Sequence, residues 1–413
     1  MRSVTFAVHA SNVAYDIGFT LSGRQNGELM VAVGSCDINV QRVRVTTEEL
    51  HGSRLVWNFV KSLLRSSLRH FINRKLCKLL RNHVTEEVKS HLKITGKQKL
   101  LHGDFHNIGI TETIGGYRHG NSSYNAIFMQ KLDKAFHQLY MNTGLVESPS
   151  TDRKGSTVFI NIPVNGEIYA PGYRNNVGRN VMSEIDMHRN KMLYIGINEF
   201  VINTLLSSLY HMDAMNFTLN SVNTPKLEDF LQTDCEDFCL GTFLPEVADA
   251  HPGRAFSLLM VADRAPAASF DVQGIQIKLT AVITVQVDAP GSKIPVMRAD
   301  VRMRATVSLR VRNQKLHGTA EVNEFDLKPR EKLNLGKDAV ELMNEVPGKV
   351  IEAELNNILD KGIQLPTLDL FSLRNVAITH VLKGIWMELD FNFNFDAVAK
   401  LIKNILKHPN SHY

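Results

Sequence analysis

The stretch VRMRATVSLRVR, residues 301–312, alternates apolar and polar side chains from end to end. All of its odd positions are apolar, and four of the six even positions are arginine. Alternation with a period of two is typical of a β-strand that is wet on one face and covered on the other. Twelve residues at about 3.3 Å each span about 40 Å, roughly twice the usual strand length. The stretch therefore predicts a sheet with an unusually long apolar face.

A second stretch, IQIKLTAVITVQV at 275–287, alternates in the same way, and the first 45 residues also indicate strands. Elsewhere apolar residues recur every three or four positions, which predicts amphipathic helices over about 53–92 and 338–362. Strands and long helices in one chain predict the α+β class. A long helix with one apolar stripe also needs an equally long apolar partner.

The totals exclude several classes of protein. A chain of 413 residues with 44% hydrophobic and 22% charged residues is globular and long enough for two or three domains. A net charge of +5 and the absence of a known binding module argue against nucleic acid as a partner. The sequence has no run of 18 apolar residues, so it predicts no membrane-spanning helix. Residues 1–10 are too short an apolar stretch for a secretory signal, which alone suggests a cytosolic protein or a chain without its natural start.

The sequence contains none of the motifs that assemble a catalytic site. It has no GxSxG elbow, no HExxH pair and no glycine-rich phosphate loop, so we expect no enzyme activity and no cofactor. His102, Asp104 and His106 would share one face of a strand and could hold a metal. The preferred interpretation is a polar segment with scattered histidines, and hence no metal site.

Cys235 and Cys239 lack the CxxC spacing of redox or zinc sites. They could bridge only within a helix or tight turn, because an extended strand would hold their Cα atoms too far apart. A local bridge and two free thiols both remain open.

Three motifs resemble a known family: FCLGTFLPEVADAHP (238–252), KMLYIGINEFVINT (191–204) and KGIQLP (361–366). Together with Cys36 and Cys77 they are similar to the bactericidal/permeability-increasing, lipopolysaccharide-binding and lipid transfer proteins. The resemblance covers about 20–92 and 131–395. It implies a boomerang-shaped fold of two highly twisted antiparallel β-barrels, each packed on a long helix and joined by a central sheet.

The resemblance also implies the domain organisation. Residues 1–170 would form the N-terminal lipid-binding barrel, with an insertion near 93–130, and 191–395 the C-terminal barrel. The family has further strands and a helix before the position of Met1, so the N-terminal barrel is expected to be incomplete. The polar stretch at 171–190 is the predicted linker, and 396–413 is predicted as an amphipathic C-terminal helix or tail.

In this family the barrels hold acyl chains in apolar pockets, which would explain the long apolar strand faces. The side chains expected to line the C-terminal pocket are Leu205, Leu209, Ile277, Leu279, Val307, Leu309, Ile351 and Leu355. The cations expected to contact lipid headgroups are Lys61, Arg65, Arg69, Lys400 and Lys403. A disulfide between Cys36 and Cys77 is implied by the resemblance, and glycosylation is expected at the sequons Asn121 and Asn216 if the chain is secreted.

The sequence thus predicts a secreted, extracellular protein that binds or transfers phospholipid or another acyl lipid and meets membrane or lipoprotein surfaces transiently. One alternative is an innate-immune antimicrobial protein that binds lipopolysaccharide. Another is an interaction protein that transfers nothing and whose pockets are structural remnants. A hydrolase, the least favoured class, would need a nucleophile inside the apolar tunnel.

Overall fold

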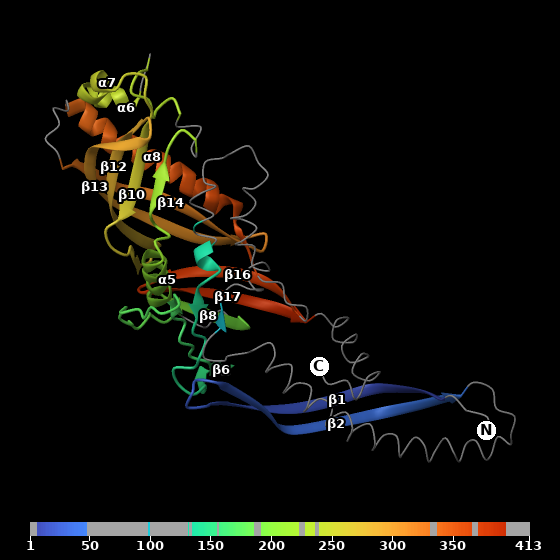
Figure 1. The fold of residues 1–413 in the computed structure, drawn as a ribbon. Helices are drawn as coiled ribbons and strands as arrows, with labels where there is room; N and C mark the ends of the chain where they lie inside the picture. Colours follow the sequence, from blue (N-terminus) through green and yellow to red (C-terminus); the bar gives the residue numbers. More distant parts are fainter. Residues whose placement is uncertain are drawn as a thin grey trace, which may run out of the picture. The chain divides into compact units, whose positions relative to one another are not determined.

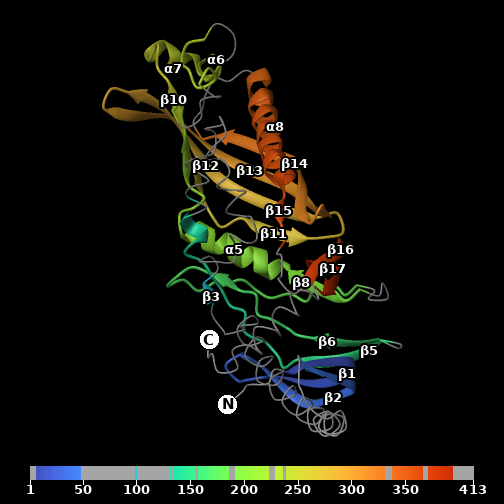
Figure 2. The same cartoon turned by 90° about the vertical axis from the view of Figure 1, so that its right-hand side faces the viewer.

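The computed structural model describes residues 6–47, 98–99, 131, 134–154, 157–185, 191–222, 228–235, 239–330, 337–365 and 371–393. Figures 1 and 2 show the chain from two directions. It divides into two compact units, the first made of residues 1–98 and 142–166 and the second of 99–141 and 167–413. The domain boundaries proposed from the sequence differ from this division and stay a prediction.

The first unit contains a long antiparallel hairpin of β1 (Phe6–Gly23) and β2 (Leu29–Thr47). A second, shorter hairpin is formed by β5 (Ser150–Lys154) and β6 (Thr157–Asn161). The predicted strands near the N-terminus are therefore confirmed. The predicted helix over 53–92 lies outside the described residues, as does the segment 93–130 apart from β3 (Gln98–Lys99).

The second unit is built on a seven-stranded sheet in the order β15-β14-β13-β12-β10-β9, with β11 also paired to β12. Its strands are β9 (Phe217–Leu219), β10 (Phe256–Ala262), β11 (Ala267–Phe270), β12 (Ile275–Ala289), β13 (Ser292–Arg312), β14 (Lys315–Pro329) and β15 (Ile363–Gln364). Both predicted long strands are confirmed, and β13 runs for 21 residues.

Smaller sheets and several helices complete this unit. β8 (Leu193–Asn198), β17 (Gly384–Phe393) and β16 (Phe371–Val381) form one sheet, and β4 (Tyr140–Met141) pairs with β7 (Ile168–Tyr169). The helices include α5 (Glu199–His211), α6 (Leu240–Phe243), α7 (Pro245–Ala250) and α8 (Lys337–Lys361), and residues 134–136 are helical as well. None of the helices in the described ranges is long and apolar enough to cross a membrane. The predicted α+β class is confirmed.

The strand register places the apolar positions of β12, β13 and β14 on one face. Leu279 pairs with Met303, which pairs with Phe325, and Ile275 pairs with Val307. A bulge in β14 opposite Arg304 and Ala305 adds one residue, which lets the apolar set continue along the same face. The arginines of the opposite set, at 302, 304, 310 and 312, are exposed. The face assignment made from alternation in 301–312 therefore agrees with the burial.

Helix α8 docks along the free edge of β14 through polar side chains. The Asn344 Oδ1 accepts a hydrogen bond from the Leu327 N–H at 2.7 Å, and the Glu352 Oε2 accepts one from the Val322 N–H at 2.8 Å. Asn356 accepts from the Ala320 N–H and donates to the Ala320 carbonyl, both at 2.8 Å. A carboxamide offers the same donor and acceptor as a peptide group, so this helix replaces the strand that the edge lacks.

Helix α5 completes two further edges in the same way. Asn203 accepts from the Ala268 N–H of β11 at 2.8 Å and donates to its carbonyl at 2.7 Å. On the other side of the helix, the Thr204 hydroxyl accepts from the Ile168 N–H of β7, and the Ser208 hydroxyl donates to the Ile168 carbonyl. Buried backbone groups need such partners, so these polar residues position the helix.

Replacing Asn356 with leucine should destabilise the second unit. The leucine keeps the helix but leaves the N–H and carbonyl of Ala320 without their partners, which costs about 2 kcal/mol in the free energy of unfolding. Urea unfolding followed by circular dichroism measures the change. Glu345→Leu, at an exposed position of the same helix, is the matched control and should leave the free energy of unfolding nearly unchanged. Equal stability of both variants would contradict the edge-completing role of Asn356.

Candidate functional site

The apolar face of the long sheet is closed at one end by the segment that carries α6 and α7. Leu240, Phe243 and Leu244 of this segment are buried. They belong to one core cluster, which we call the α6–α7 cluster and which also contains Phe256, Val285, Val287, Met297 and neighbouring residues. Several members are fully buried, among them Phe256 and Val287 at 0% exposure. This end of the sheet is a filled core.

A second cluster covers the opposite end of the same face. It is centred on Phe270 and Ile275. The long strands contribute Ile277, Val307 and Leu309, α5 contributes Ile202 and Leu206, and β16 and β17 contribute Ile378 and Ile385. We call this the α5 cluster. Helix α5 therefore contributes two residues four positions apart, on one side of the helix, to the long sheet.

Between these ends lies a band of large apolar side chains that belongs to neither cluster. Leu279, Met303 and Val322 are each half-buried and lie on the inner face of three neighbouring strands. On α8, Ile351 and Leu355 are half-buried as well, next to the edge-binding residues Glu352 and Asn356. This central band, Leu279, Met303 and Val322 with Ile351 and Leu355, is the candidate site for an apolar ligand.

The eight residues predicted to line a pocket divide into three groups. Ile277, Val307 and Leu309 belong to the α5 cluster, and Leu279, Ile351 and Leu355 to the central band. Leu205 and Leu209 pack elsewhere, against Leu139 and Ile168 on the other side of α5. The helix is apolar on two sides, so sequence periodicity did not distinguish them. Met303, which sequence reasoning left out, is signalled only by its register with Leu279.

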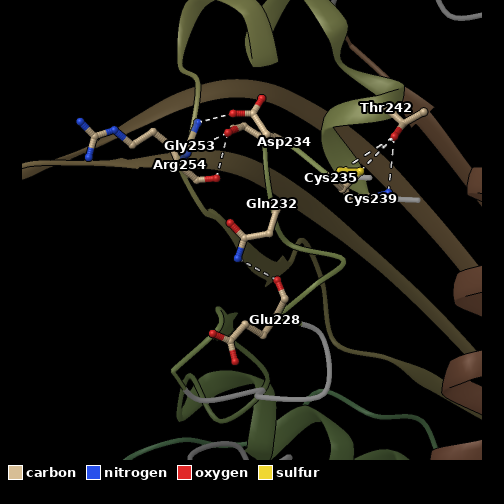
Figure 3. The surroundings of a disulfide bond; sticks show 9 residues. Glu228, Gln232, Asp234, Cys235, Cys239, Thr242, Gly253 and Arg254 are labelled. Carbon is tan, nitrogen blue, oxygen red and sulfur yellow. Dashed lines mark hydrogen bonds between the residues drawn. A yellow bond between two sulfur atoms is a disulfide. The ribbon is translucent and has the colours of Figure 1, made fainter. Parts of the chain in front are cut away.

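The α6–α7 segment is tied down by covalent and polar contacts (Figure 3). Cys235 and Cys239 form a disulfide, so the local bridge left open by the sequence is present. The Asp234 carboxylate accepts from the Gly253 N–H at 2.5 Å, and the Thr233 hydroxyl accepts from the Arg254 N–H at 2.8 Å. Gly241 lies so close to the Thr233 carbonyl that a Cβ there would overlap it. The described part of the family-like motif, residues 239–252, thus forms the end wall of the apolar face.

The motif at 191–204 forms a junction between sheets. Asn198 caps α5 by accepting from the Phe200 N–H at 2.8 Å. The buried Glu199 carboxylate accepts from Asn180 at 2.8 Å and from the Phe270 N–H at 3.3 Å, with the Lys383 ammonium 3.8 Å away. These contacts connect α5, β11 and the turn between β16 and β17. At the C-terminus of α8, Gly362 adopts a φ of +69°, as expected for the predicted helix end in KGIQLP.

His380 joins β16 to the end of β13. Its Nε2 accepts a hydrogen bond from the Leu309 N–H at 3.3 Å, so that nitrogen must be unprotonated. Burial lowers the pKa of His380 below its ordinary value, while the nearby Asp271 carboxylate acts in the opposite direction. The neutral imidazole is therefore the form that fits this junction.

The remaining predicted residues are placed as follows. Cys36, in β2, is disulfide-bonded, but its predicted partner Cys77 lies outside the described residues, so that pairing stays a prediction. Several other predicted residues also lie outside the described part of the chain. They are Lys61, Arg65, Arg69, Asn121, Lys400, Lys403, the tail 396–413 and the triplet His102, Asp104 and His106. Asn216 is half-buried and donates to Asp213 at 3.1 Å. Among the residues that the structure describes, no group of three or more His, Cys, Asp or Glu could hold a metal.

Taken together, the twisted antiparallel sheet with a helix along its edge and a partly covered apolar face defines an α+β protein of the tubular lipid-binding type. Residues 134–393 match the family model described as the LBP / BPI / CETP family, C-terminal domain. The match spans more than half of the chain, and the chain belongs to this family. The resemblance seen in the sequence motifs is confirmed.

Individual relatives are distant. The chain is 21% identical over 373 residues to a bactericidal permeability-increasing protein of Rattus norvegicus, covering 88% of this chain and 68% of the relative. It is 22% identical over 384 residues to a lipopolysaccharide-binding protein of Homo sapiens, covering 91% and 70%. A crystal structure of lipopolysaccharide binding protein aligns with a TM-score of 0.44 and 16% identity, covering 94% of this chain and 77% of that one.

The stability of the second unit should fall on acidification through His380. Because the pKa of His380 is lower in the folded chain than the ordinary value near 6.5, folding favours the neutral ring. The contribution of the neutral His380 ring to the free energy of unfolding is complete above that ordinary value. It is lost as the pH falls below that value. The melting temperature of His380→Gln should therefore decrease less than that of the wild type between neutral and mildly acidic pH. Identical profiles for His380→Gln and the wild type would refute the role of His380.

Proposed function

We propose that this chain is a lipid-binding protein that holds the acyl chains of a phospholipid-like amphiphile against the central band. The observation that carries the proposal is the half-buried state of Leu279 and Met303 in the middle of a sheet face whose two ends are filled. Large apolar side chains that stay partly accessible inside a long covered face suit an apolar ligand. Membership of the LBP / BPI / CETP family supports the same function.

The physics of such a site is burial alone. Each methylene moved from water to an apolar surface contributes about 0.8 kcal/mol, so an acyl chain is held without any bond being made or broken. The function proposed is therefore binding or transfer rather than catalysis.

We also propose that the protein acts outside the cell. The bridge between Cys235 and Cys239, and the absence of any free cysteine in the part of the chain that the structure describes, suit an oxidising compartment. An extracellular lipid carrier could meet membranes and lipoprotein surfaces transiently while its ligand stays shielded from water.

A second candidate ligand is lipopolysaccharide, since relatives covering most of this chain are named for binding it. Such a molecule combines acyl chains with phosphate groups, so its binding would depend on salt as well as on apolar contact. Competition between a short-chain phospholipid and lipopolysaccharide, measured at low and high salt, separates the two candidates. A steep loss of binding as the salt concentration rises favours lipopolysaccharide as the ligand.

Replacing Leu279 with aspartate should abolish lipid retention while the sheet stays folded. A carboxylate on the inner face would repel acyl chains and would have to be desolvated whenever lipid binds. Native mass spectrometry of the purified protein, with lipid extraction, measures the bound lipid. We expect wild-type protein to carry acyl lipid and Leu279→Asp to carry at least ten times less.

The matched control is Thr319→Asp, which adds the same charge at an exposed position of β14. Threonine 319 lies on the outer face, opposite Ser308, so its carboxylate stays in water. Far-ultraviolet circular dichroism should be the same for both variants. If both retain lipid equally, or if wild-type protein carries none after expression in lipid-rich medium, the central band is not a lipid site.

A further inference from the structure

Figure 2 shows the hairpin formed by β13 and β14. The outer face of its turn end carries three cations. Arg312 lies directly opposite Lys315, and Arg310 lies directly opposite His317. Arg310, Arg312 and Lys315 are all exposed. The turn between the strands, Asn313 and Gln314, has positive φ at both residues, which is the geometry of a tight two-residue hairpin. We call these three cations the basic hairpin end.

Several cations elsewhere on the outer face have carboxylate partners. Arg304 pairs with Glu324 at 3.0 Å, Lys328 with Asp326 at 3.0 Å, and Arg330 with Asp300 at 2.6 Å. The Arg330 guanidinium also lowers the pKa of the Asp300 carboxyl, mainly through its hydrogen bond. In contrast, none of the three cations of the basic hairpin end forms an ion pair with another described residue. Lys278 also lies opposite Arg304, but there the Glu324 carboxylate offsets the charge.

This arrangement works against the stability of the hairpin. Like charges placed directly opposite each other on an antiparallel pair repel, and here Arg312 and Lys315 do so without a carboxylate between them. An anion bound between the two strands would remove the repulsion. Guanidinium groups in particular bind phosphate through paired hydrogen bonds. Among the described residues no carboxylate pairs with these cations, so a phosphate could bind there.

The opposite face of the same hairpin end indicates where that phosphate comes from. Val311 pairs with Leu316 there, and both side chains are half-buried. A hairpin end that is cationic on one side and apolar on the other suits the boundary between headgroups and acyl chains. A soluble linear polyanion would use the cations but gain nothing from Val311 and Leu316.

The basic hairpin end lies next to the α5 cluster, which closes one end of the apolar face. Leu309, one residue before Arg310, is a member of the α5 cluster that closes the apolar face. Leu309 and Leu359 of α8 both lie within 3.4 Å of the position that a Cβ on Gly318 would occupy. A surface bound at the hairpin end would therefore be next to the edge where β14 and α8 meet.

We propose that the basic hairpin end docks this protein onto an anionic lipid surface, with Arg310, Arg312 and Lys315 contacting the phosphates. The proposal deepens the lipid-binding function above and rests on it, since docking would bring the apolar face to the lipid that it takes up or delivers. The partner is defined by its chemistry: a bilayer or lipoprotein surface that carries net negative headgroups.

The test compares two triple variants with the same change in net charge. In the first, Arg310, Arg312 and Lys315 are each replaced by glutamine. In the second, the exposed cations Arg174, Arg254 and Lys278, elsewhere in the same unit, are replaced by glutamine. Binding is measured by co-sedimentation with vesicles of phosphatidylcholine mixed with phosphatidylglycerol, and with vesicles of phosphatidylcholine alone. Each cation near an anionic surface contributes roughly fivefold to partitioning, so the first variant should bind about 100-fold more weakly to the anionic vesicles.

The control variant should keep most of the binding, and high salt should weaken the wild type but not the first variant. Arg310→Lys combined with Arg312→Lys keeps the charge and should retain most of the binding. The proposal would be overturned if the two triple variants lost equal amounts of vesicle binding. It would also be overturned if the wild type bound sulfated dextran but not anionic vesicles. Lipid found by native mass spectrometry distinguishes this failure from that of the ligand site, because the first triple variant should still carry bound lipid.

Discussion

The structure depends on how the free edges of a long, twisted sheet are satisfied. An edge strand leaves a row of N–H and carbonyl groups without partners, and these groups are costly when protein covers them. Here helices complete the edges with side chains: Asn356 on β14, Asn203 on β11, and Thr204 with Ser208 on β7. Each of these pairs copies the donor and acceptor of a missing strand. The register of the helices on the sheet follows from these contacts.

This mode of docking holds α8 in place without requiring the middle of the sheet face to be fully packed. Because α8 is fixed by Asn344, Glu352 and Asn356 along the edge, it need not bury its whole apolar stripe in the sheet to be held in place. The middle of the sheet face can then remain half-covered at Leu279 and Met303, while filled clusters at both ends support the strands. A fully packed face would be more stable, so the half-covered middle is consistent with the acyl-chain site proposed above.

The two ends of the apolar face are closed by different means. At one end the Cys235–Cys239 bridge and backbone contacts around Gly241 hold the α6–α7 segment onto buried aromatic and aliphatic side chains. At the other end, the closure relies on polar junctions, with Glu199 linking three elements and His380 linking two sheets. The basic hairpin end lies beside this second, more polar closure.

The sequence alone determined the α+β class, the two long strands with their inner and outer faces, the extent of α8 and the family, because alternation, helical period and the motifs are local properties. It could not assign Leu205 and Leu209 to their cluster, since α5 is apolar on two sides and only its packing distinguishes them. The bulge in β14 was equally hidden, because it exists only relative to the register of β13. The central band, the edge-completing side chains and the opposition of Arg312 and Lys315 were decided by tertiary structure, because each depends on residues that pairing or packing brings together.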